Sequence, residues 1–133
     1  MSYVYSQKGN ERVLSDDVYL ISETDDKGRI LFANDAFCEI AGYTVEELIG
    51  KPHNIVRHPD MPRAAFKDLW DTIQSGKEWT GFVQNLVKGG GHYWVYATVF
   101  PLMRGNQRTY LSVRKKPTED EITATEALYR TLH

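Results

Sequence analysis

The sequence predicts an α+β domain: an antiparallel sheet with short helices packed over one face and a trailing C-terminal helix. Three observations predict it. Two β-forming segments joined by a turn come first, several short helical segments follow, and three alternating strands precede a last helix. Runs of strands separated from runs of helices are typical of this class. With 133 residues the chain has room for one domain with one core.

Composition narrows the class of protein. With 41% hydrophobic and 26% charged residues, the chain is typical of a soluble globular domain. A formal net charge of −2 gives no sign of a nucleic-acid groove, and there is no run of Lys or Arg for a membrane surface. Cys38, the single cysteine, excludes an internal disulfide and a cysteine-cluster metal site. No apolar run is long enough to span a bilayer and the polar N-terminus is no signal peptide, so we expect a cytoplasmic location.

The first strands follow a short N-terminal segment. Residues 1–15 are expected to form a loosely held cap. The segment 18–24 is rich in β-forming residues, residues 25–28 supply turn chemistry, and the segment 29–33 is the return strand of a hairpin.

Three helical segments come next. Asn34 is an N-cap signal for a helix that Gly42 ends, and Thr44 opens a capping box for a second, short helix ending at Gly50. The segment 64–75 predicts a third helix, which ends near Gly76. Its apolar stripe consists of Ala65, Phe66, Leu69, Trp70 and Ile73.

The second half alternates with a period of two, as strands do. The segment 78–88 and the segment 92–102 form a hairpin around a turn at 88–91, and 108–115 is the last strand. One face carries Trp79, Gly81, Val83, Asn85 and Val87, and then Tyr93, Val95, Ala97 and Val99. The sequence therefore divides into a cap (1–15), a central domain (16–116) and a C-terminal linker helix (117–133) that opens with acidic residues.

The connection between the second and third helices, residues 51–62, concentrates polar groups between three prolines. Proline lacks an amide donor and biases the preceding residue toward extended conformations, so this segment is neither a regular helix nor a central strand. Polar side chains on a constrained connection indicate a binding site. The alternative is a solvated loop whose charges face water.

Three segments together resemble a PAS domain. They are Phe32-Ala-Asn-Asp-Ala-Phe-Cys-Glu-Ile-Ala-Gly-Tyr43, Glu46-Glu-Leu-Ile-Gly-Lys-Pro52, and the hairpin from Trp79 to Trp94. The loop Pro52-His-Asn-Ile-Val-Arg-His-Pro-Asp-Met-Pro62 resembles, more specifically, that of the FAD-binding PAS domains of bacterial aerotaxis (energy-taxis) receptors. The resemblance runs from about Leu14 to Leu132. It implies a five-stranded antiparallel sheet whose concave face is covered by the helices and this loop, with FAD bound non-covalently between them.

The resemblance also implies site residues. Arg57, His58 and Asp60 match positions that bind FAD in that family. An arginine offers a forked cation to a diphosphate oxygen, a histidine donates to phosphate or ribose, and an aspartate accepts from ribose or orients the arginine. A self-contained Arg57–Asp60 pair that only holds the loop is the competing interpretation. Asn34 matches a further family position, and its role as a helix N-cap competes with it.

The ring of a flavin is flat and apolar on its faces and polar along one edge. Asn85 lies mid-strand on the inward face, where an unpaired amide costs about 1–3 kcal/mol, and it offers the donor and acceptor that such an edge needs. Arg114 reaches the N5/O4 edge of the ring if its strand face points inward, and Phe66 is a better candidate for ring contact than Trp70. Val83, Val95 and Val99 are expected to line the ring faces with Trp79 and Tyr93. The candidate cofactor residues are Asn34, Arg57, His58, Asp60, Phe66, Trp79, Asn85, Tyr93 and Arg114.

Other classes stay open. A light-oxygen-voltage photoreceptor needs a reactive cysteine in the region 54–57, whereas Cys38 falls in the first helix. A haem-binding PAS sensor would use His53 or His58 as an axial ligand, although the polar loop disfavours it. A sensor for another small ligand, or a cofactor-free interaction module, would share the fold. An enzyme is not expected, since no nucleophile with an adjacent base, metal triad or glycine-rich phosphate loop is present.

The resemblance implies a redox or oxygen sensor for energy taxis. Its flavin oxidation state would be passed to a chemotaxis-type signalling region, on the same chain or a separate one, and PAS–PAS homodimers are a further expectation. The sequence leaves open whether the chain is an excised domain or a stand-alone protein.

Overall fold

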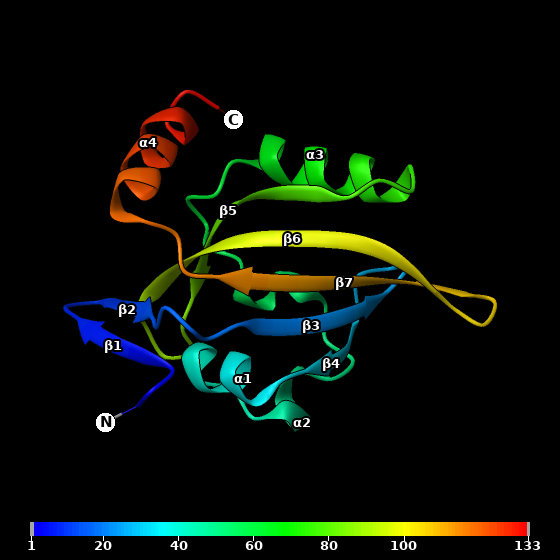
Figure 1. The fold of residues 1–133 in the computed structure, drawn as a ribbon, viewed down its shortest axis with the longest axis horizontal. Helices are drawn as coiled ribbons and strands as arrows, with labels where there is room; N and C mark the ends of the chain where they lie inside the picture. Colours follow the sequence, from blue (N-terminus) through cyan, green and yellow to red (C-terminus); the bar gives the residue numbers. More distant parts are fainter. Residues whose placement is uncertain (1, 133) are drawn as a thin grey trace.

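The computed structural model describes residues 2–132; Met1 and His133, the ends of the expected cap and linker helix, lie outside the described residues. One seven-stranded sheet runs through the molecule (Figure 1). In chain order the elements are β1 Tyr5–Lys8, β2 Glu11–Leu14, β3 Leu20–Asp25, β4 Ile30–Ala33, α1 Asp35–Ala41, α2 Val45–Leu48, the 3-10 turn η1 His53–Val56, α3 Arg63–Gln74, β5 Trp79–Leu86, β6 His92–Arg104, β7 Gln107–Lys115 and α4 Glu119–Tyr129.

The α+β class is confirmed, and the strand count is corrected from five to seven. The five expected strands are β3 to β7, and they pair antiparallel in the spatial order β5-β6-β7-β3-β4. The two further strands come from the segment expected to be a loose cap. β2 joins β6 through one parallel pair, Glu11 with His92, so the sheet is mixed.

The N-terminal segment is held firmly rather than loosely. β1 and β2 form an antiparallel hairpin, and both Val4 and Leu14 are buried at its base. One Arg12 guanidinium nitrogen donates to the carbonyl oxygens of Glu39 and Ile40 at 3.1 and 3.0 Å. These carbonyls lie at the end of α1, where helical hydrogen bonds run out, and a cation there is favourable. This hairpin was not predicted because its exposed strands lack an apolar alternation.

The expected faces of the central strands are confirmed. Trp79 pairs with Val99, Val83 with Val95, and Asn85 with Tyr93 across β5 and β6. Side chains directly opposite in a sheet share a face, and all six of these are buried. This inward face, continued by the even-numbered residues of β3 and β7, carries the core and the cavity described below.

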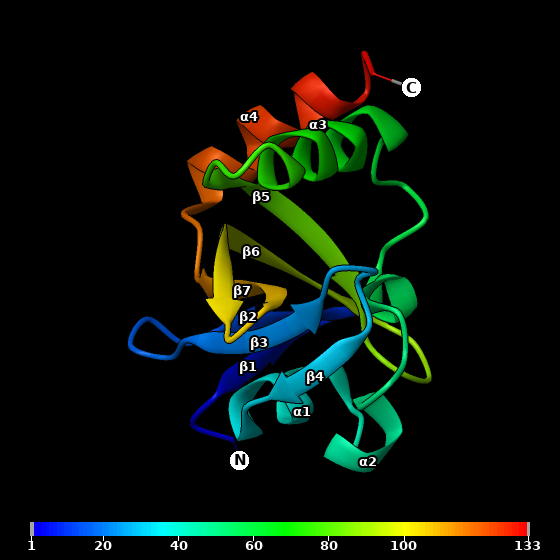
Figure 2. The ribbon, with the colours of Figure 1, turned by 90° about the vertical axis from the view of Figure 1, so that its right-hand side faces the viewer.

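Helices lie at both ends of the sheet. Figure 2 shows α1 and α2 at one end and α3 and α4 at the other. The C-terminal helix α4 begins with the Thr118 capping box and ends at Tyr129, whose hydroxyl donates to the Phe82 carbonyl oxygen of β5 at 2.6 Å. The tilted contact of the Tyr129 and Trp94 rings places α4 against the outward face of β5 and β6. Among residues 2–132, no helix is long and apolar enough to cross a membrane.

Asn34 joins β3 to α1. Its side-chain oxygen accepts from the backbone N–H groups of Phe37 and Ile21, both at 3.1 Å, and its amide nitrogen donates to the Tyr19 carbonyl at 3.0 Å. The predicted N-cap is therefore confirmed, and the amide also ties the helix to the strand beside it.

We expect Asn34→Ala to lower the free energy of unfolding of the ligand-free domain by about 1–2 kcal/mol, the usual loss for an N-cap. Urea unfolding followed by circular dichroism measures this. Asn34→Asp keeps the accepting oxygen and should lose less. Equal stability of the alanine variant and the wild type would contradict this structural role.

Candidate functional site

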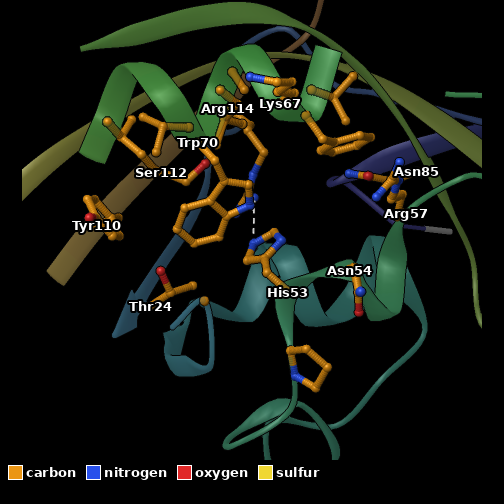
Figure 3. Close-up of a pocket in the computed structure, with 18 of the residues that line it drawn as sticks. Thr24, His53, Asn54, Arg57, Lys67, Trp70, Asn85, Tyr110, Ser112 and Arg114 are labelled. Atoms are coloured by element: carbon orange, nitrogen blue, oxygen red, sulfur yellow. Dashed lines mark hydrogen bonds between the residues drawn. The ribbon is translucent and has the colours of Figure 1, made fainter. Parts of the chain in front are cut away.

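A cavity of about 450 Å³ lies between the inward face of the sheet and the covering elements η1 and α3 (Figure 3). This volume is in the range of small-molecule sites, about 300–1,000 Å³. The apolar part of its wall is formed by Phe66, Leu69, Trp70, Ile73, Val83, Ala97, Val99 and Tyr110. The polar and charged part includes Thr24, Lys27, His53, Asn54, Arg57, Lys67, Asn85, Ser112 and Arg114.

Aromatic rings shape the side of the cavity under α3. The amphipathic pattern of α3 turns Phe66 and Trp70 toward the sheet, and the Trp70 indole meets Tyr110 edge-on with ring centroids 5.8 Å apart. Trp70 also covers the β3–β4 turn, where a Cβ atom on Gly28 would lie 3.0 Å from the indole. Flat rings and branched aliphatic side chains make this part of the site suited to a planar, apolar ligand.

A buried polar cluster forms another part of the wall. Arg114 points inward from β7; its Nη2 donates to Ser22 Oγ at 2.6 Å, and its Nη1 lies 3.1 Å from His53 Nε2. The Ser22 hydroxyl is 3.0 Å from the same His53 nitrogen. Figure 3 shows the His53 ring directed toward Arg114. The Phe37 ring packs against both, with the guanidinium carbon 4.5 Å and the imidazole centroid 5.8 Å from its centre.

Burial and the neighbouring guanidinium hold His53 neutral. Burial first, and then the charge of Arg114, lower the pKa of His53 to about 3. Burial likewise lowers the pKa of Arg114 to about 10, which leaves the guanidinium charged at neutral pH. A neutral imidazole that accepts at Nε2 carries its proton at Nδ1. His53 therefore offers the cavity a neutral ring.

Asn85 and Tyr93 lie opposite each other on β5 and β6. Asn85 lines the cavity and is buried, whereas Tyr93 is buried behind the wall. Burial raises the pKa of the Tyr93 hydroxyl, an effect that Arg114 and the Asn85 amide oppose. The hydroxyl has no hydrogen-bond partner of normal geometry in the described part of the chain. Asn85 and this hydroxyl therefore form a polar patch among the apolar side chains that β5 and β6 place on the inward face.

The proline-rich loop is attached to the free edge of β5. Arg57 forms an isolated antiparallel bridge with Asn85, and the His58 N–H donates to the Gln84 carbonyl at 3.3 Å. The Gln84 N–H in turn donates to the Met61 sulfur at 3.3 Å. A strand edge presents unpaired backbone groups that need partners. The loop supplies them, and this fixes its position beside the cavity.

Arg57 stands between two hollows. It lines the cavity and also an open outer groove, whose other residues include Asp60, Met61 and Arg63. Its guanidinium carbon lies 3.8 Å from the centre of the Phe66 ring, a cation–π contact. The Asp60 carboxylate lies 3.9 Å from His58 Nδ1, and among the described residues it forms no ion pair with Arg57. The competing interpretation, an Arg57–Asp60 pair that only holds the loop, is therefore not what the structure shows.

The charge of the cavity has one sign. Lys27, Arg57, Lys67 and Arg114 line it, and no Asp or Glu among the described residues does. The chain as a whole carries a formal charge of −2. Cationic groups gathered in a partly enclosed, low-dielectric site attract anionic or electron-rich ligands.

The structure brings together four of the nine candidate cofactor residues in the cavity wall: Arg57, Phe66, Asn85 and Arg114. Asp60 lines the outer groove. The remaining candidates lie outside both hollows. Asn34 caps α1, Trp79 turns its N–H to Asp68 at 2.8 Å, and Tyr93 is packed behind Asn85. His58 Nδ1 accepts the Asp60 N–H at 3.0 Å inside the loop.

Two cavity residues were considered from the sequence and not chosen. Trp70 was assigned to the core because its helical spacing fits either role, and His53, which could be a further contact, a haem ligand or only a loop histidine, was left off the candidate list. The signal for His53 was its place directly after Pro52, at the start of the constrained loop. Ser22 and Ser112 could have been found as small polar residues at inward positions of predicted strands.

Helices thus cover one sheet and enclose with it a cationic, partly aromatic cavity. The chain belongs to the PAS fold family, whose model matches residues 30–113. It is 50% identical over 121 residues to the aerotaxis receptor of Escherichia coli, covering 90% of this chain and 24% of the receptor. It is 29% identical over 97 residues to the nitrogen fixation regulatory protein of Klebsiella pneumoniae, covering 71% of this chain and 20% of that protein. The chain thus spans about a quarter or less of these relatives.

Solved structures of light-oxygen-voltage domains share the fold. One, determined with a flavin analogue, superposes with a TM-score of 0.72 at 22% identity, covering 84% of this chain and 87% of that one. The dark-state Aureochrome1 domain gives a TM-score of 0.70 at 21% identity, covering 83% and 86%. At these identities the likeness concerns the fold. Cys38 lies in α1, does not line the cavity, and has its pKa raised, chiefly by burial.

We expect the stability of the ligand-free domain to fall by about 2 kcal/mol between pH 7 and pH 5, because of His53. The unfolded chain takes up a proton at this histidine below its ordinary pKa of 6.5, whereas the folded chain does so only near 3. The folded state is therefore stabilised above pH 6.5 and loses that advantage as the pH falls. Urea titrations at each pH measure it.

His53→Gln should remove most of this slope, whereas His92→Gln, at a histidine outside the cavity wall, should keep it. The window ends at pH 5 because Glu23 and Asp25, whose pKa values are lowered, contribute at lower pH. An unchanged slope in His53→Gln would show that this histidine is not held neutral.

Proposed function

We propose that this chain is an FAD-binding PAS redox sensor domain for energy taxis. The observation that carries the proposal is the cavity itself: an apolar, aromatic slot that contains Asn85 and Arg114 and adjoins a polar outer groove at Arg57. The 50% identity to an aerotaxis receptor supports the biological role. The resemblance of the proline-rich loop to that of FAD-binding aerotaxis PAS domains supports the cofactor.

The residues fit a flavin dinucleotide. The wall between α3 and the sheet suits the faces of an isoalloxazine ring, and Asn85 offers both a donor and an acceptor to its uracil-like edge. Arg57 and Asn54 line both hollows, so a ligand can extend from one to the other past them. A diphosphate in the outer groove would meet Arg57 and Arg63, which is the reason to prefer FAD to a flavin mononucleotide.

When bound, a flavin supplies reversible electron uptake, and its oxidation state would follow the electron-transport system or the redox poise of the cell. The chain's own residues bind and orient the ring, exclude water from it and hold a fixed positive charge beside it. Asn85 belongs to β5, which the loop and Tyr129 of α4 both contact. A rearrangement at Asn85 would therefore reach α4. The receiver would be a chemotaxis-type signalling region on the same chain or a partner.

The competing cofactor classes fit less well. A haem needs an axial nitrogen, but His53 Nε2 is engaged by Arg114 and Ser22, and His58 lies outside the cavity wall. A cysteine adduct of the light-oxygen-voltage type needs a thiol within about 3–3.5 Å of the ring, and Cys38 does not line the cavity. A cofactor-free interaction module does not require an internal cavity lined by four cationic side chains.

The purified protein should be yellow, with flavin absorption near ~450 nm, and heat should release FAD rather than the mononucleotide. Arg57→Ala should lower the FAD retained per folded protein about tenfold or more, the usual effect of losing a charge-assisted hydrogen bond. Arg108→Ala, on β7 away from both hollows, serves as the matched control. A Soret band, or a colourless protein that takes up no added FAD, would falsify the proposal. Equal losses of folding and of flavin in Arg57→Ala would assign the loop a structural role alone.

Asn85→Leu should shift the midpoint potential of the bound flavin by about 60–130 mV to more negative values. The reason is that a donor in a dry site stabilises added electron density by about 1.5–3 kcal/mol, and 59 mV corresponds to a tenfold change for one electron. Anaerobic spectroelectrochemical titration measures the shift. Gln84→Leu, one residue along on the opposite face, is the control. An unmoved potential with full FAD occupancy would place Asn85 away from the ring edge.

A further inference from the structure

Arg114 is a buried cation held by neutral partners. Arg114 is 3% exposed, and its guanidinium hydrogen-bonds to a serine hydroxyl and to a neutral imidazole. Its third contact is with the Phe37 ring, whose centre lies 4.5 Å from the guanidinium carbon. In the described part of the chain the Arg114 Nε atom is buried without a hydrogen-bond partner, and no Asp or Glu carboxylate forms an ion pair with Arg114.

Another arginine of the same sheet shows what a compensated charge looks like. Arg104 forms a two-pronged contact with the Glu23 carboxylate, at 2.9 and 2.7 Å, and Thr109 donates to the same carboxylate at 2.6 Å. This pair lies on the outward face, where Arg104 is also solvated. Arg114 has neither a carboxylate nor water exposure to offset its burial.

The surroundings of Arg114 offer no other source of negative charge. β3 contributes Ser22, η1 contributes His53 and α1 contributes Phe37 to its contacts. On β6 the residue paired with it is Ala97, and the nearby Tyr93 hydroxyl is kept protonated by burial, which raises its pKa. The cavity side holds three further cations and, among described residues, no acid.

Burying a charge without a counter-ion destabilises the folded state, and such a group is typically retained where it has a functional role. Arg114 lines the cavity. Among the described residues its guanidinium has no carboxylate partner, and its Nε–H has no acceptor. A ligand in the cavity can supply the missing negative charge or acceptor to the guanidinium.

We propose that Arg114 is the specificity-determining residue of the cavity: it selects a ligand edge with negative charge or strong acceptors and leaves the ligand-free domain less stable than an apolar residue there would. The first half of this inference rests on the proposed function, since a flavin's carbonyl and ring-nitrogen edge is such a group. The second half concerns the ligand-free chain alone.

Replacing Arg114 by an apolar residue leaves few buried polar groups without a hydrogen-bond partner. Ser22 and His53 are already 3.0 Å apart, so the serine hydroxyl can donate to His53 Nε2 without Arg114. Methionine has about the length of the arginine stem, and it would lie against Phe37 as the guanidinium does now. The desolvation cost is then relieved, whereas few hydrogen bonds are lost.

The experiment compares Arg114→Met, Arg114→Lys and the control Arg104→Met with wild type. Thermal unfolding of the ligand-free proteins gives the stability, and titration with riboflavin gives ring recognition, because riboflavin lacks phosphates and does not depend on Arg57. We expect Arg114→Met to melt higher than wild type by about 3–10 °C and to bind riboflavin about 10- to 100-fold more weakly. Arg114→Lys keeps the charge and should retain more of the affinity.

Arg104→Met should do the reverse: it strands the buried Glu23 carboxylate, so it should melt lower and bind riboflavin as wild type does. An Arg114→Met protein that melts lower than wild type, or that binds riboflavin equally well, overturns the inference. A wild-type protein that takes up neither FAD nor riboflavin overturns the proposed function instead, and the direction of the melting shift still decides whether the charge is uncompensated.

Discussion

The core and the cavity of this domain depend on the antiparallel pairing of β5 with β6. Its register, Asn85 opposite Tyr93 and Trp79 opposite Val99, places one set of side chains on the inward face. Because strand side chains alternate, a slip of one residue would move that whole set to the outward face. The core, the cavity wall and the polar patch around Asn85 all depend on this one register. β7 extends it, and the pairing of Arg114 with Ala97 brings the arginine inward.

The second constraint is that β5 is an edge strand with respect to the rest of the sheet. Its free backbone groups take partners from two distant parts of the chain: the loop bonds Gln84 and Asn85, and Tyr129 of α4 bonds Phe82. The loop beside the cavity and the C-terminal helix α4 are thus both attached to β5, within the four positions 82–85. This arrangement gives a short physical route between the cavity and the C-terminal helix.

Much of the fold could be predicted from the sequence because its signals are local. Alternation in 78–88 and 92–102 gave the correct faces, and Asn34 and Thr44 are caps in the structure as expected. The N-terminal hairpin was missed, since its strands are largely exposed and only Val4 and Leu14 enter the core. Part of the site was also accessible: inward polar residues on strands, such as Asn85, and a polar loop confined by prolines.

The sequence by itself thus determined the class of fold, the inward face of the sheet and the irregular backbone of the 51–62 loop. It could not determine which residues of that loop face the cavity, because a loop has no repeating geometry. Only the tertiary structure decided that His53 turns inward onto Arg114 while His58 stays within the loop. It also decided that Arg114 is a charge without a counter-ion, since compensation depends on what four separate elements bring near it, and no local pattern records that.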